Sequence, residues 1–162
     1  MNRSYLSLGS NQGDRLKYLE KAIILLEEGG GHVTARSAVY ETEPWGFASD
    51  ISFYNQAVEL ISNQGPWQLL DDIHKIENSC GRTRGAERYV PRTLDIDILL
   101  FNSDIINTPE LVLPHPGLHL RRFVLVPLAE IASLIIHPVL LKSISELLQF
   151  CNDDKRVIRR LS

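Results

Sequence analysis

The chain has 162 residues, a length that fits a single domain over residues 1–162. Hydrophobic residues make up 44% of it and charged residues 23%, proportions that exclude a disordered or collagen-like chain. The 17 Lys and Arg against 20 Asp and Glu give a net charge of −3, so no overall positive field attracts nucleic acid or an anionic membrane. We expect neither as a partner, and any site for a polyanion must be local.

The sequence lacks the patterns typical of export or membrane insertion. Its first nine residues alternate polar and apolar side chains, whereas a secretory signal needs a continuous apolar stretch. The most apolar region, residues 123–136, is interrupted by Pro127 and Glu130 and is too short to span a membrane. Cys80 and Cys151 have no Cys or His at ligand spacing, which favours free thiols in a reducing compartment. We expect a cytoplasmic protein and, because no apolar surface stripe is identifiable, a monomer.

Hydrophobic periodicity predicts an N-terminal strand followed by a helix. Residues 3–8 alternate as a half-buried strand that ends at the turn residues 9–13. Asp14 is positioned to cap the helix, which stops at the glycines of residues 29–31. The apolar residues of this helix recur every three or four positions: Leu16, Leu19, Ile23 and Leu26.

A second strand, a third strand and a second helix are predicted next. Residues 33–40 are rich in β-branched and small side chains, and residues 53–61 alternate again. A long loop, residues 41–52, separates them and contains the Pro, Gly and Ser typical of loops. The turn residues 63–66 lead into a helix with its own apolar set: Leu69, Leu70, Ile73 and Ile76. Loops as long as 41–52 are often functional.

The second half of the chain begins with another long loop, residues 79–93, and the clearest strand, residues 94–101. Residues 102–104 are typical of a hairpin turn, with a short returning strand at residues 105–106. Two short helices are expected near the C-terminus, one around Leu128 and Ile131 and one carrying Ile144, Leu147 and Leu148. The order β, α, β, β, α, β predicts an α+β, ferredoxin-like βαββαβ core with a mainly antiparallel sheet and additional C-terminal helices.

Two carboxylates lie in the strand 94–101. Its two-residue side-chain period places Asp95 and Asp97 on one face, and the apolar residues on the other: Leu94, Ile96, Ile98 and Leu100. Two carboxylates on a stiff strand can converge on hard cations such as Mg²⁺, which accepts a few carboxylates together with water and phosphate. An isolated Asp-x-Asp is also compatible with a solvated acidic face, so the surrounding sequence has to decide.

The loop before this strand concentrates positive charge. Arg82, Arg84, Arg88 and Arg92 occur there with a single acidic residue, Glu87. Arginine binds phosphate through a planar fork of donors, so four of them beside a carboxylate pair indicate a triphosphate site with its metals. The alternative, surface arginines in weak ion pairs, explains less well their concentration in an acidic chain.

Weaker signals point to a ligand ring. Aromatic side chains occur in the segment Thr42 to Gly46 and at the start of the strand that begins at Phe53. Nearby, the amide of Asn55 can present a donor and an acceptor to the edge of a heterocycle. Such aromatics are also common in cores. His115, held between two prolines, suits either phosphate binding or a backbone contact.

Together these residues give the chain a resemblance to the 6-hydroxymethyl-7,8-dihydropterin pyrophosphokinases of folate biosynthesis over nearly its whole length. The matching segments are Gly9-Ser10-Asn11, Thr42 to Gly46, Asn55, Glu77, Arg82 to Arg92, Pro91 to Ile98, Pro114-His115, Arg121 and Phe123. The resemblance implies that the pterin hydroxymethyl oxygen attacks the β-phosphorus of ATP and that AMP leaves. The family pattern is not matched at Gly85, Tyr89, Val90 and Pro116.

The resemblance also implies roles for individual residues. It implies that Asp95 and Asp97 are ligands of two Mg²⁺ ions and that Arg82 and Arg92 are catalytic. The nucleotide is assigned to His74, Glu77, Arg82, Arg84, Arg88, Arg92, Ile98, His115 and Arg121. The pterin is assigned to Thr42, Glu43, Trp45, Phe53, Asn55, Asp95 and Phe123.

Two other classes of function remain open from the residues alone. A different Mg²⁺-dependent nucleotidyl or phosphoryl transferase would use the same paired acids, and the identity of the product separates it from a pyrophosphokinase. A ferredoxin-like module that binds RNA through the arginine loop would tolerate loss of Asp95, although the net charge of −3 argues against it.

Overall fold

The structure is a computed structural model that describes residues 1–42, 51–81 and 93–160. Its elements in chain order are β1 (Asn2–Ser10), α1 (Arg15–Glu28), β2 (His32–Arg36), β3 (Tyr40–Thr42), β4 (Phe53–Ser62), α2 (Pro66–Ser79), β5 (Asp95–Phe101), β6 (Ile106–Asn107), β7 (Val112–Leu113), the 3₁₀ helix η1 (Leu118–Leu120), α3 (Arg122–Ala132), α4 (Ile144–Gln149) and β8 (Val157–Arg159). The predicted loops 41–52 and 79–93 fall largely outside the described residues.

The main sheet has the strand order β5-β1-β4-β3-β8, with β2 also paired to β4, and every pairing is antiparallel. The strands β1 and β4 pair over their whole lengths, from Asn2 opposite Ser62 to Ser10 opposite Tyr54. Helices α1 and α2 connect strands in the order expected for two β-α-β units. The predicted α+β, ferredoxin-like fold with C-terminal helices is confirmed.

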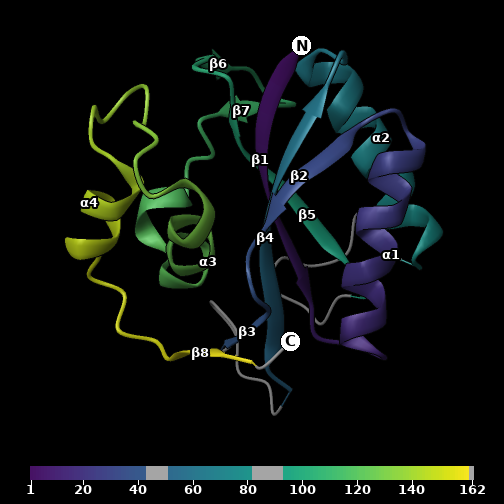
Figure 1. The fold of residues 1–162 in the computed structure, drawn as a ribbon, viewed down its shortest axis with the longest axis horizontal. Helices are drawn as coiled ribbons and strands as arrows, with labels where there is room; N and C mark the ends of the chain where they lie inside the picture. The colour runs from purple at the N-terminus through teal and green to yellow at the C-terminus, as the bar shows by residue number, and fades with distance from the viewer. Residues whose placement is uncertain (43–50, 82–92, 161–162) are drawn as a thin grey trace.

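Helices cover both faces of the sheet: α1 and α2 lie on one side, and α3 and α4 on the other (Figure 1). A larger apolar cluster, which includes Leu8, Leu69 and Ile96, fills the space beneath α1 and α2. A second cluster, which includes Tyr5 and Leu125, packs beneath α3 and α4. We call these two sides the α1 face and the α3 face of the sheet. In the described part of the chain, no helix has the length and apolar character needed to cross a membrane.

Helix α1 begins as predicted. Asp14 caps it by accepting a hydrogen bond from the Lys17 backbone N–H at 3.2 Å, which satisfies one donor of the first turn. Of the four apolar residues in its repeat, Leu19, Ile23 and Leu26 are buried, whereas Leu16 is 51% exposed. This residue lies in the first turn, at the edge of the apolar stripe.

The interior of β5 departs from simple alternation. Its pairing with β1 shifts by one residue, so that Ile98 is opposite Leu6 whereas Leu100 is opposite Tyr5. This irregularity, a β-bulge, leaves Leu99 as an extra residue. Leu99 and Leu100 therefore both join the cluster on the α3 face. The prediction that Leu100 shares a face with Leu94, Ile96 and Ile98 is wrong, since side chains change sides at the bulge.

Two other predicted strands also differ. The strand expected over residues 33–40 is split into β2 and β3 by residues 37–39, where the register with β4 breaks. The turn after β5 exists, with the Asp104 N–H donating to the Phe101 carbonyl at 2.9 Å. The returning strand does not pair with β5: β6 pairs with β7 as a separate two-stranded sheet. Strand β8 was not predicted from the sequence.

Candidate active site

A row of residues across three strands organises the site. Gly9 on β1 lies opposite Asp95 on β5 and opposite Asn55 on β4. Residues directly opposite each other project to the same side of a sheet, and the row projects to the α3 face. Neighbouring strands are about 4.8 Å apart, so the backbones of Asp95 and Asn55 are separated by about 10 Å with only a glycine between them.

Asp95 and Asp97 lie on this face of the edge strand β5, as the sequence predicts. Their α-carbons are about 7 Å apart in an extended strand, and the Asp97 side chain is 39% exposed. Carboxylate oxygens are the donors that Mg²⁺ accepts when water and phosphate complete its coordination. Among the described residues, no group of three or more His, Cys, Asp or Glu is arranged to hold a metal. Two carboxylates by themselves leave most of the coordination of such an ion to water and phosphate oxygens.

His115 follows β7 with its imidazole turned toward the acidic pair. Its backbone N–H donates to the Leu99 carbonyl at 2.9 Å, which anchors this loop at the outer edge of β5. Nδ1 accepts from the Gly117 backbone N–H at 3.0 Å, so the neutral ring carries its proton on Nε2, 3.8 Å from Asp97 Oδ1. Burial, assisted by the charge of Arg121, lowers the pKa of His115 to about 4. The ring is neutral at pH 7 and presents an N–H donor beside the acids.

Arg121 precedes α3 and shares this turn with His115. A β-carbon on Gly117 would lie 2.8 Å from Arg121 Cζ, which means that the guanidinium packs against the bare Gly117 backbone. A cation and a neutral N–H donor are thus grouped at the end of the sheet that carries the two carboxylates. Phosphate oxygens are bound by such donors.

The residues predicted to bind the pterin edge come together on β3 and β4. Thr42 and Asn55 are each 3% exposed, and Asn55 Nδ2 donates to Thr42 Oγ1. Asn55 Oδ1 lies over Gly9, because a β-carbon there would be only 3.0 Å from this oxygen. Phe53 is two residues before Asn55 on the same face of β4, and a carbon of its ring lies 3.7 Å from the same position. Phe123, in the first turn of α3, is half-buried against the second apolar cluster.

The predicted nucleotide residues on α2 and β5 lie along the outer edge of the sheet. Glu77 is 2% exposed, and its Oε2 accepts from the Ile96 backbone N–H at 3.0 Å, on the side of β5 away from β1. The backbone of Ile98 faces the same edge because N–H direction repeats every two residues, whereas its side chain is buried. His74, three residues before Glu77 on α2, is half-buried.

Six of the predicted site residues lie outside the described part of the chain: Glu43, Trp45, Arg82, Arg84, Arg88 and Arg92. Two interactions next to the site were missed by sequence reasoning. Gly117 positions both His115 and Arg121, and Glu130 on α3 is hydrogen-bonded to Tyr40 on β3. The glycine two residues after His115 was a weak sequence signal for the role of Gly117. Nothing in the local sequence signals the hydrogen bond between Glu130 and Tyr40.

Fold and site define a class of protein. An antiparallel α+β sheet that groups two carboxylates, a neutral histidine and an arginine beside a buried amide fits an enzyme that transfers phosphate-containing groups to a small ring substrate. This assignment agrees with comparisons to known proteins.

Residues 5–133 match the family model described as 7,8-dihydro-6-hydroxymethylpterin-pyrophosphokinase (HPPK). The 2-amino-4-hydroxy-6-hydroxymethyldihydropteridine pyrophosphokinase of Bacillus subtilis is 48% identical over 131 residues, which cover 80% of this chain and 78% of that protein. The Aquifex aeolicus protein of the same name is 42% identical over 142 residues, 88% of each chain. The chain belongs to the HPPK family, whose members transfer a pyrophosphoryl group from ATP to hydroxymethyldihydropterin in folate synthesis.

The same fold occurs in solved structures. A crystal structure of wild-type Plasmodium falciparum HPPK-DHPS with pteroate superposes with a TM-score of 0.76 at 18% identity and covers 91% of this chain. The present chain spans only 44% of that longer one.

Proposed function

We propose that this chain transfers the pyrophosphoryl group of ATP to the hydroxymethyl oxygen of 6-hydroxymethyl-7,8-dihydropterin and requires Mg²⁺ for it. Family membership supports the reaction. The structural observation that carries the proposal is the row in which Asp95 and Asn55 flank Gly9. In this row a carboxylate suited to a metal ion and an amide suited to the edge of a ring lie within the length of one small substrate.

Asp95 and Asp97 are proposed to hold two Mg²⁺ ions. The ions, when bound, offset the negative charge of the ATP phosphates and favour loss of the proton from the pterin hydroxyl. His115 donates from Nε2 to a phosphate oxygen, and Arg121 offsets phosphate charge. His74, Glu77 and Ile98 are proposed to contact the rest of the nucleotide, and Arg82, Arg84, Arg88 and Arg92 to hold its phosphates.

The pterin is proposed to lie along the row on the α3 face. The Thr42 backbone and the Asn55 amide read the polar edge of the ring, while Phe53 and Phe123 contact its faces. Glu43 and Trp45 are proposed to complete the site. The hydroxymethyl oxygen then points toward the acidic pair, where it forms a bond to the β-phosphorus of ATP. The bond from this phosphorus to the oxygen bridging to the α-phosphorus breaks, and AMP leaves with that oxygen.

A single-domain, cytoplasmic monomer is the proposed form of the enzyme. The net charge of −3 and the absence of a broad basic character support small molecules rather than nucleic acid or membranes as partners. Light scattering during gel filtration should give a mass near 18.3 kDa. A mass twice as large would contradict the monomer.

The direct test measures AMP release from ATP and Mg²⁺, with and without 6-hydroxymethyl-7,8-dihydropterin. We expect pterin-dependent AMP from the wild type and its near-complete loss in Asp97→Ala, a drop of about 100-fold or more. Asp104→Ala removes an exposed carboxylate beyond the other end of β5 and serves as the matched control. Release of inorganic diphosphate instead of AMP, or activity of Asp97→Ala within a few-fold of wild type, would contradict the proposal.

A further inference from the structure

Glu130 connects α3 to three segments on the far side of the site from the acidic pair. Its two carboxylate oxygens each lie 3.2 Å from the Ala38 backbone nitrogen, which donates to them. The Tyr40 hydroxyl donates to Oε2 at 2.6 Å, and Arg159 Nη2 donates to Oε1 at 3.3 Å. One carboxylate therefore binds the break between β2 and β3, the start of β3, and β8.

These partners determine where Thr42 lies. Tyr40 is opposite Asn55 in the pairing of β3 with β4, and Thr42 follows two residues later on the same face. On its other side β3 pairs with β8, where Tyr40 is opposite Arg159. Strand β3 is only three residues long, so its own ladder hydrogen bonds restrain it weakly. A carboxylate bound to its first residue and to the chain just before it adds restraint where the ladder is short.

Helix α3 links Glu130 to Phe123. Glu130 follows Phe123 by seven residues in α3, so the two side chains share a face of the helix, about 10 Å apart along its axis. Because Glu130 is fixed to β3, the same helix face is held at a defined distance from the sheet. In the proposed pose, Phe123 on α3 contacts a face of the pterin ring and the Thr42–Asn55 pair on the sheet binds its polar edge, so the distance between them must match the ring.

We propose that Glu130 is a positioning residue for the pterin, which fixes the separation between Phe123 and the Thr42–Asn55 pair. Charge-assisted hydrogen bonds are shorter and stronger than neutral ones, and a carboxylate can accept from several donors at once. The bonds to Ala38 and Tyr40 are the important ones, since Arg159 is 66% exposed and its ion pair is screened by solvent. This inference rests on the proposed pterin-binding function of the site.

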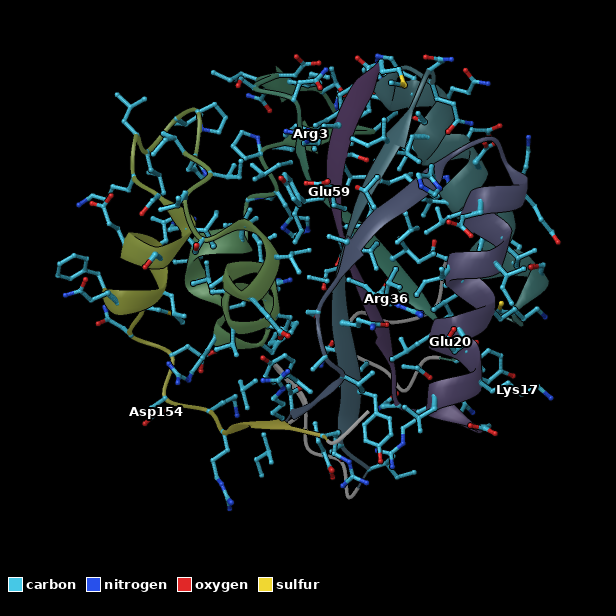
Figure 2. All side chains as sticks on the ribbon, viewed as in Figure 1. Arg3, Lys17, Glu20, Arg36, Glu59 and Asp154 are labelled. Carbon is cyan, nitrogen blue, oxygen red and sulfur yellow. The ribbon has the colours of Figure 1, made fainter. Side chains whose placement is uncertain are left out.

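The same sheet offers a matched control in Glu59. It accepts from the Tyr5 hydroxyl at 2.7 Å and from Thr34 Oγ1 at 2.6 Å, much as Glu130 accepts from Tyr40. Glu59 lies toward the upper end of β4, beside Arg3, whereas β3 and β8 lie at the lower end (Figures 1 and 2). It binds a buried tyrosine in the same way, but away from the proposed pterin residues.

The experiment compares Glu130→Gln with Glu59→Gln in the full chain. Each variant is assayed for the free energy of unfolding, for kcat, and for KM of pterin and of ATP separately. We expect the pterin KM of Glu130→Gln to rise about fivefold or more, with the ATP KM and kcat at saturating pterin within about twofold of wild type. Glu59→Gln should keep both KM values within about twofold, even if it is destabilised to a similar degree. Should Glu130→Gln fail to fold, Tyr40→Phe removes a single hydrogen bond and should raise the pterin KM by a smaller factor.

Three outcomes would overturn this role for Glu130. The pterin KM could stay unchanged in folded Glu130→Gln or, if that variant fails to fold, in Tyr40→Phe. Both KM values could rise together, or Glu59→Gln could raise the pterin KM equally. A wild type with no pterin-dependent AMP release would instead overturn the proposed function, and with it the pterin role of this residue.

Discussion

Gly9 is the residue on which the geometry of the site depends most closely. It stands between Asp95 and Asn55 in the row across β5, β1 and β4, and its missing side chain lets Asn55 Oδ1 lie close to the β1 backbone. A glycine inside a strand often marks a close approach of a ligand. Here the nearest atom to an added β-carbon is Asn55 Oδ1, the oxygen proposed to bind the pterin.

Gly9→Ala should therefore impair pterin binding more than stability. We expect the pterin KM to rise about tenfold, because the Asn55 amide must move by a few tenths of an ångström and the methyl group occupies the proposed ring position. Gly65→Ala is the control, since no atom lies within 4 Å of a β-carbon there. Steady-state kinetics with pterin varied at saturating ATP provide the measurement, and equal KM values for both variants would contradict the proposed ring position.

Tyr40 predicts a pH dependence of stability. Burial, with help from the hydrogen bond to Glu130, raises the pKa of Tyr40 to about 12, whereas the unfolded chain ionises near 10. Above pH 10 the unfolded state loses this proton before the folded state does, so stability from Tyr40 is present below pH 10 and is lost as pH rises toward 12. The difference in unfolding free energy between wild type and Tyr40→Phe, from urea denaturation, should thus shrink between pH 9 and pH 11. A difference that is constant or grows would contradict this.

Among the elements, β5 shows that a two-residue alternation can predict one part of a strand correctly and fail in the next part. The alternation that puts Asp95 and Asp97 on one face holds up to Ile98, where the bulge begins. A bulge depends on how two strands meet, which local periodicity does not contain. It moves Leu100 to the α3 face and leaves the Leu99 carbonyl accepting from the His115 backbone. The irregular residue thus anchors the loop that brings His115 to the acids.

Glu77 fixes β5 to α2 and gives a test at this level. Glu77→Ala removes the acceptor of the buried Ile96 N–H, and we expect the free energy of unfolding to fall by about 1–3 kcal/mol. Glu28→Ala, at the exposed end of α1, should change it by less than about 0.5 kcal/mol. Urea denaturation monitored by circular dichroism measures both. If Glu77→Ala leaves stability unchanged and raises only the ATP KM, its role is nucleotide contact and not support of the strand.

For the whole molecule, one sheet is shared by two cores. Leu69 packs in the cluster on the α1 face and Leu125 in the cluster on the α3 face, and both side chains are 0% exposed. Because the strands β1, β4 and β5 contribute to both clusters, loss of either should weaken the same cooperative unit.

Leu69→Ala and Leu125→Ala should each lower the free energy of unfolding by about 2–5 kcal/mol within a single transition. Circular dichroism and intrinsic fluorescence, recorded on the same urea series, should give coincident curves for both variants. Two separate transitions in Leu125→Ala would show instead that α3 and α4 unfold independently of the sheet.

The sequence by itself determined most of the elements and the chemistry. Periodicities of two and of three to four residues predicted the central strands and the helices, because burial of one face imposes those repeats on local sequence. Asp95 and Asp97, taken together with the arginines of the preceding loop, predicted a site for hard cations and phosphate, since carboxylates are chemically suited to such cations. Resemblance to a family added the expected roles of Asn55 in pterin binding and of His115 in nucleotide binding.

Only the tertiary structure decided which of these residues meet. The separation of Asp95 from Asn55 depends on β1 lying between β5 and β4, so that Gly9 spaces them. The bulge in β5, the added strand β8 and the binding of Glu130 to Tyr40 were not predicted either. All of these depend on contacts between segments far apart in the chain, where strand register and helix docking are set by packing across the sheet and not by local pattern.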